Sequence, residues 1–202
     1  MNEHSKKDTI LESGIDIVNQ LGPRFFTVEY LAQKLGMSKK TIYKFFPTKD
    51  NIIHSIFDYM MKTVGKKFSN VVNSTDNALV KFYKIKKELQ SIDSRLSIEK
   101  IAEVKDRYPD LWKKLEQFRL ERKNDFHKII QEGQDQGLFS KDRDAEKLSG
   151  IIILFINQTL QPEILMKYNL TFYDMFDVFF DLTIKGLLST KGRQELEKME
   201  NI

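Results

Sequence analysis

Cysteine is absent from this sequence of 202 residues. Without thiols, neither a disulfide framework nor a thiolate metal site can form, and a reducing cytoplasm is the simplest setting for the protein. Proline and glycine are scarce as well, with four and nine residues. Because both residue types interrupt regular structure, their scarcity favours long helices over many short strands. Lys, Glu, Leu and Ile are frequent, so the composition predicts an all-α fold.

Long apolar segments are missing too. The longest purely apolar run spans residues 151–156, far short of the ~20 residues needed to cross a bilayer. The N-terminal segment contains two lysines but neither an apolar core nor a small-residue cleavage site, which argues against a secretory signal. We therefore expect a soluble, cytoplasmic protein with no membrane partner.

Positive charge is unevenly distributed along the chain. The net charge is +4, and the segment 34–49 contains five lysines and no acidic residue. Such a cluster is the electrostatic footprint expected of a phosphate-binding surface. A run of charge is usually only a solvated helix face, so this one needs support from its structural setting.

Apolar residues recur at steps of three and four along nearly the whole chain, which is typical of amphipathic helices. About nine helices are expected, over residues 10–21, 27–35, 38–46, 48–71, 79–92, 96–104, 108–133, 144–167 and 172–189. The charged tail from Thr190 is expected to fray. We predict a small three-helix domain over residues 1–50 and a larger helical-bundle domain over residues 51–202. The fourth helix, from about residue 49, would link them.

Residues 27–46 combine two short helices with a tight turn. Thr27 and Ser38 can each cap the helix that follows, because a side-chain oxygen at this position accepts from a free backbone N–H. Gly36 permits a left-handed turn between the helices. Apolar residues of both helices, Leu31, Leu35, Ile42 and Phe46, can form a small core. This is the helix-turn-helix pattern, whose second helix enters the major groove of DNA.

The segment from Phe26 to Asp50, FTVEYLAQKLGMSKKTIYKFFPTKD, resembles the DNA-binding signature of the TetR family of regulators. Two positions depart from the usual family pattern, which often has glycine at Lys40 and histidine at Phe45, so the operator sequence cannot be taken from relatives. The resemblance implies phosphate contacts for Thr27, Tyr43 and Lys49, and positions at or beside the bases for Ser38, Lys39, Lys40, Thr41 and Lys44.

The resemblance also implies that the larger domain binds a small molecule and forms a homodimer through the last two long helices. Residues for the dimer interface are Ile152, Phe155, Phe176, Phe179, Phe180 and Leu187. Burial of these helices within one subunit is the alternative. Residues for a ligand pocket are Tyr83, Trp112, Phe118, His127, Phe155 and Gln158, each of which could equally belong to an ordinary core.

We therefore expect a DNA-binding transcriptional regulator, a repressor that a small apolar ligand releases from double-stranded operator DNA. The alternative is a helical architectural protein that binds many dispersed DNA sites without an inducer. Catalysis is not expected, since the three histidines lie in separate parts of the chain and neither HExxH nor a glycine-rich phosphate loop occurs. No metal site and no cofactor are expected. The inducer, the operator and the regulated genes cannot be read from the sequence.

Overall fold

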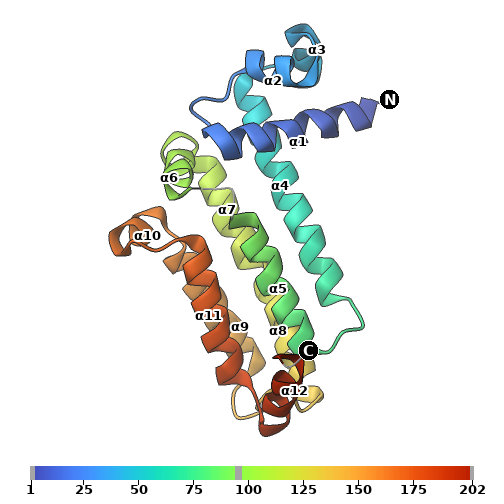
Figure 1. Cartoon of the computed structure of the whole chain (residues 1–202), viewed down its shortest axis with the longest axis vertical. Helices are drawn as coiled ribbons and strands as arrows, with labels where there is room; N and C mark the ends of the chain where they lie inside the picture. The colour runs from blue at the N-terminus through green and yellow to red at the C-terminus, as the bar shows by residue number, and fades with distance from the viewer. Residues whose placement is uncertain (1–2, 94–96, 201–202) are drawn as a thin grey trace. The chain divides into compact units, whose positions relative to one another are not determined.

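The computed structural model describes residues 3–93 and 97–200, and within them it contains helices and no strand. The helices in chain order are α1 (Glu3–Leu21), α2 (Val28–Leu35), α3 (Lys39–Phe45), α4 (Lys49–Val72), α5 (Ala78–Asp93), α6 (Ile98–Arg107), α7 (Pro109–Glu121), α8 (Lys123–Asp135), α9 (Ala145–Thr159), α10 (Pro162–Tyr168), α11 (Phe172–Leu187) and α12 (Thr190–Glu200) (Figure 1). The predicted all-α fold is confirmed.

The chain divides into two compact units. One contains residues 1–64 and 95–114, and the other contains residues 65–94 and 115–202. Helices α4 and α7 each begin in the first unit and end in the second. The first unit thus holds more than the helix-turn-helix, because α6 and the start of α7 belong to it. The ligand-binding and dimerisation roles expected for residues 51–202 stay predictions.

The first unit is organised around α1, α2, α3 and the first half of α4. Helix α2 packs against both α1 and α3. Helices α1 and α4 approach closely at Gly14, where an added Cβ would lie 2.5 Å from Cδ1 of Ile56. The fully buried side chains of this unit include Ile10, Ile17, Phe26, Leu31, Ile42, Phe46, Ile52, Ile53 and Ile56. Removing this apolar surface from water holds the short helices α2 and α3 in place, since isolated helices of this length are unstable.

The second unit is a bundle in which α5, α8, α9 and α11 pack together. The packed pairs are α8 with α9, α5 with α11, and α5 with α8. Its centre is aromatic: the ring of Phe82 lies 5.3–6.4 Å from those of Phe126, Phe139 and Phe180, mostly edge to face. Gly133 is required here, because an added Cβ would lie 2.1 Å from the Phe139 ring.

Three segments differ from the sequence prediction. The expected helix 108–133 is divided at Arg122 into α7 and α8. The expected helix 144–167 is divided into α9 and α10, which are bent by 72°, because Pro162 begins a new helix. The tail is not frayed: it forms α12, which is anchored by the buried side chain of Leu196 and by the Ser189 hydroxyl donating to the Gly137 carbonyl at 2.7 Å.

Candidate DNA-binding site

Helix α2 begins as the sequence predicts. Thr27 is extended, and its hydroxyl oxygen accepts from the backbone N–H of Tyr30 at 3.1 Å. The cap uses a lone pair of this hydroxyl and leaves its O–H without an acceptor among the described residues. An exposed Thr27 can therefore cap the helix and still donate to a phosphate oxygen.

The turn between α2 and α3 depends on Gly36. This residue has φ 61° and ψ 29°, the left-handed conformation that costs glycine little. The next N–H, that of Met37, donates to the Ala32 carbonyl at 2.9 Å and closes the end of α2. A side chain at position 36 would strain the turn that sets the direction of α3.

Helices α3 and α4 are both capped by hydroxyl side chains. Ser38 accepts from the backbone N–H of Thr41 at 3.1 Å, and the two hydroxyl groups lie 2.9 Å apart. Thr48 accepts from the backbone N–H of Asn51 at 3.1 Å. These caps fix the start of α3, where the predicted base contacts lie, and the start of α4, where Lys49 lies.

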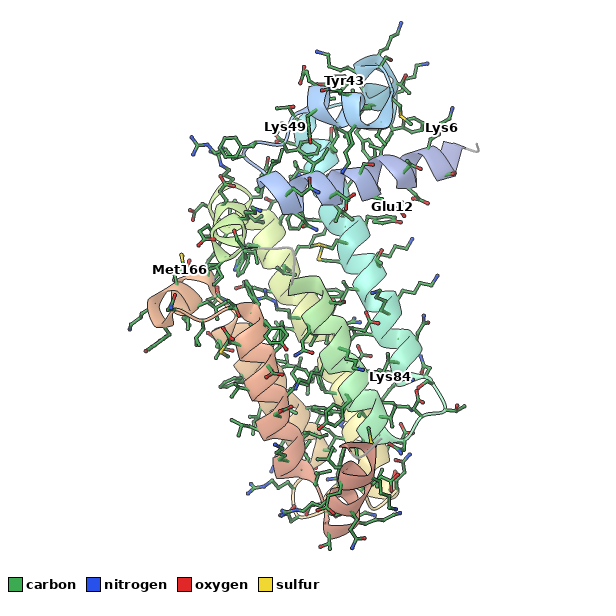
Figure 2. All side chains as sticks on the ribbon, viewed as in Figure 1. Lys6, Glu12, Tyr43, Lys49, Lys84 and Met166 are labelled. Carbon is green, nitrogen blue, oxygen red and sulfur yellow. The ribbon has the colours of Figure 1, made fainter. Side chains whose placement is uncertain are left out.

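The side chains predicted to touch DNA all belong to the first unit. Tyr43 is 42% exposed, and the half-buried Lys49 begins α4 (Figure 2). Lys40 and Lys44 are exposed and have no ion pair among the described residues. Exposed cations without a carboxylate partner are suited to phosphate or base edges. Of the remaining predicted residues, Thr27, Ser38 and Lys39 are exposed, and Thr41 is half-buried.

Lys39 is the exception among the lysines of α3. Its Nζ lies 2.6 Å from Oε1 of Glu29 in the first turn of α2. The hydrogen bond from Lys39 lowers the pKa of the Glu29 carboxyl, and the same contact raises the pKa of Lys39. The sequence segment 34–49 contains no acid, but the fold brings one to its edge. This pair could not be predicted from the sequence, because no helical spacing relates residues ten apart across a turn.

Residues 98–114 are joined to α1 and α4 within the first unit. Lys100 donates to the carbonyls of Asn19 and Gln20, at 2.7 and 2.9 Å, and so caps the end of α1. Lys114 pairs with Asp58 at 2.6 Å. These polar contacts, which no sequence pattern indicates, attach α6 to α1 and the start of α7 to α4, the helix on which Lys49 lies.

His54 makes a further contact of this kind. Its Nδ1 lies 2.8 Å from the Asp50 carbonyl oxygen and its Nε2 lies 2.7 Å from Oδ2 of Asp110. Both partners are acceptors, so both ring nitrogens donate only when the ring is protonated. Burial opposes this, but the hydrogen bonds to Asp50 and Asp110 outweigh it and raise the pKa of His54.

The predicted pocket residues are not gathered in one place. Trp112 is buried in the first unit, whereas the other five belong to the second. Phe118 is half-buried beneath the Arg122 guanidinium, 4.8 Å from the ring centroid. The remaining four lie as follows: Tyr83 is half-buried on α5, His127 is half-buried on α8 beside Glu146, and Phe155 and Gln158 are exposed on α9. A pocket made of these residues stays a prediction.

The predicted dimer residues fall into two groups. Ile152, Phe176, Phe180 and Leu187 are buried inside the second unit, as the alternative of burial within one subunit expects. Phe155 and Phe179 instead stack on each other near the surface, with ring centroids 4.6 Å apart and planes 9° apart. Around them lie exposed apolar side chains that the sequence analysis did not select. We call the whole set the α9–α11 strip: Ile151, Leu154, Phe155, Val178, Phe179 and Leu182.

The segment that contains the helix-turn-helix resembles that of a known protein family. Residues 10–56 match the model of the family described as bacterial regulatory proteins, tetR family. The chain is also 23% identical, over 179 residues, to an uncharacterised HTH-type transcriptional regulator, YvaF, of Bacillus subtilis, covering 88% of this chain and 93% of that protein. Residues 10–56 are therefore a TetR-type DNA-binding domain. The chain is a DNA-binding transcriptional regulator, a class of protein that is not enzymatic.

Solved structures of transcriptional regulators share the fold over nearly the whole chain. A transcriptional regulator from Cytophaga hutchinsonii superimposes with a TM-score of 0.72 at 16% identity, covering 91% of this chain and 99% of that one. The regulator FadR from Bacillus subtilis, solved in complex with stearoyl-CoA, gives a TM-score of 0.62 at 18% identity, covering 89% and 98%. At such identities the likeness concerns the fold alone.

No single helix in residues 3–93 and 97–200 is both long enough and apolar enough to span a membrane. Helices α9 and α10 have the required length and apolar character only when the bent pair is counted as one segment. No group of three or more potential metal ligands occurs in the same part of the chain.

Proposed function

We propose that this TetR-family chain is a repressor that binds operator DNA as a homodimer and is released by a small apolar ligand. The observation that supports it most is the surface of α3, where a capped helix presents the exposed side chains of Lys40, Tyr43 and Lys44. A helix of this kind fits the major groove, and its first residues then meet the base edges.

The residues of this surface divide into two roles. Thr27, Tyr43 and Lys49 hold phosphates and fix the position of α3, whereas Lys40 and Thr41 read bases. Phosphate contacts contribute affinity on any sequence, and base contacts contribute specificity. Because the family often has glycine at the position of Lys40, this side chain provides a contact that a glycine cannot make.

A second copy of the chain is the proposed occupant of the α9–α11 strip. Ile151, Leu154 and Leu182 are 64%, 57% and 69% exposed, which is unusual for large apolar side chains gathered on adjacent helices. Gly186 lies one turn beyond Leu182, and an added Cβ there would meet no atom within 4 Å, so a second helix can approach closely. A two-fold dimer fits readers of this class, which contact two half-sites about 34–36 Å apart.

The apolar ligand is supported by the second unit. Its centre is rich in phenylalanine, and FadR, which shares the fold, was solved with stearoyl-CoA. Asn157 is buried on α9, and its Oδ1 has no hydrogen-bond partner among the described residues. Because buried polar atoms are nearly always paired, we expect a polar group of the ligand to meet Asn157.

The ligand acts by favouring a state with lower affinity for DNA. Residues 98–114 provide the connection to the DNA-binding helices, since Lys100, His54 and Lys114 join them to α1 and α4. A movement of α7 would therefore also move the start of α4, where Lys49 lies.

Selection of bound duplexes from a random pool, using the full chain, tests the proposal. It should return two related half-sites about 10–10.5 base pairs, or a multiple of this, apart. Stearoyl-CoA, used as an apolar probe, should then weaken binding to the selected duplex, and Asn157→Leu should reduce that effect. A genome-wide footprint at one or a few promoters supports a regulator. Hundreds of dispersed sites, or no enriched sequence, would instead favour the architectural role.

A further inference from the structure

The ion pair between Glu29 and Lys39 joins the two helices of the helix-turn-helix. Glu29 lies in the first turn of α2, and Lys39 is the first residue of α3. Nζ of Lys39 lies 2.6 Å from Oε1 of Glu29, and the two side chains remain 52% and 65% exposed, respectively. The contact therefore fixes where the Lys39 charge lies without burying it.

This pair distinguishes Lys39 from the other lysines of α3. Lys40 and Lys44 have no carboxylate partner among the described residues, so their charges are available to an external anion. The charge of Lys39 is already balanced. The raised pKa of Lys39 and the lowered pKa of Glu29 keep both groups ionised across the neutral range, so this balance persists.

We propose that Glu29 is a specificity-determining residue: it keeps Lys39 from serving as one more phosphate ligand on arbitrary DNA. Binding to non-specific DNA depends almost entirely on neutralised phosphates, each of which releases counterions. A lysine paired with a carboxylate contributes little to that release. It retains two further N–H donors for a base edge, because an ammonium group has three. Glu29 thus lowers affinity for random sequences more than affinity for the operator. The inference rests on the proposed DNA-binding function.

The salt dependence of binding to a random-sequence duplex tests this role. In Glu29→Gln the released Lys39 should neutralise one further phosphate, so the slope of log K against log salt should steepen by about 0.9. The ratio of the variant's affinity to the wild-type affinity should then be about 3.5-fold smaller at 200 mM salt than at 50 mM salt, because four to the power 0.9 is about 3.5.

A matched control separates this effect from a general gain of charge. Glu88→Gln also adds one positive charge and frees a lysine, Lys67, from an ion pair of 2.7 Å between α4 and α5. Since both residues belong to the second unit, away from the DNA-binding helices, the slope of this variant should stay at the wild-type value. Lys39→Gln should leave the slope for random DNA unchanged, and Glu29→Gln combined with Lys39→Gln should match Lys39→Gln alone.

The outcomes separate this role from the function it rests on. An unchanged slope in Glu29→Gln, an equal change in Glu88→Gln, or a steeper slope that survives in the double variant would overturn the role of Glu29. Equal melting temperatures for the variants exclude unfolding as the cause of any difference. If the folded wild type binds no duplex at 50 mM salt, the proposed function itself fails.

Discussion

Leu182 is the most exposed side chain of the α9–α11 strip, and truncating it should weaken the proposed dimer strongly. Leu182→Ala removes three carbon atoms, each contributing about 0.8 kcal/mol when buried. The side chain is 69% exposed in the single chain, so about 1.7 kcal/mol per subunit depends on the partner. Two-fold symmetry doubles this to about 3.3 kcal/mol, or roughly a 250-fold rise in the dissociation constant of the dimer.

Sedimentation equilibrium over a range of protein concentrations measures this constant directly. Tyr168→Ala provides the control, because Tyr168 is 62% exposed but lies on α10, outside the strip. The control should dissociate as the wild type does, whereas Leu182→Ala should become monomeric at concentrations where the wild type is dimeric. A wild-type chain that is monomeric throughout, or a Leu182→Ala dimer as tight as the wild type, would refute the assignment of this surface.

Further predictions concern DNA binding, stability and pH. Lys49→Ala should weaken binding to every duplex and reduce the salt slope by about 0.9, whereas Lys40→Ala should alter sequence preference; equal losses on all sequences would contradict this division. Glu132→Ala removes the carboxylate that lies 2.7 Å from the ammonium group of Lys81, a residue only 3% exposed. Urea unfolding should show a free energy of unfolding lower by about 3 kcal/mol, and a loss below 1 kcal/mol would contradict a stabilising role of this ion pair. The stabilisation of the fold by His54 should be complete below the pKa of about 6.5 that this residue has in the unfolded chain, and it should be lost as pH rises through the raised pKa of the folded state. In thermal melts, His54→Gln should make the melting temperature depend less on pH, and an unchanged pH profile would contradict the contact with Asp110.

The helix-turn-helix could be predicted from the sequence because its determinants are local. Thr27 and Ser38 cap the two helices that they were predicted to cap, and Gly36 adopts the left-handed conformation predicted for the turn. Each of these features depends on a residue type and a spacing of a few positions, which a single sequence displays.

Features that depend on contacts between distant residues could not be predicted. The helix boundary at Arg122 carries neither proline nor glycine, and α12 is anchored by Ser189 and Leu196 against segments far away in the chain. The break before α10 is different, because Pro162 is a local signal that marks the start of this helix. The pairing of Glu29 with Lys39 arises only once the turn at Gly36 brings α2 and α3 together.

Amide hydrogen exchange of the full chain, with and without the duplex selected from the random pool, tests the central claim most directly. We expect DNA to slow exchange in α3, at the start of α2 around Thr27 and at the start of α4 around Lys49. Protection confined to α5 and α8–α12, with α3 unchanged, would contradict the placement of this helix on DNA.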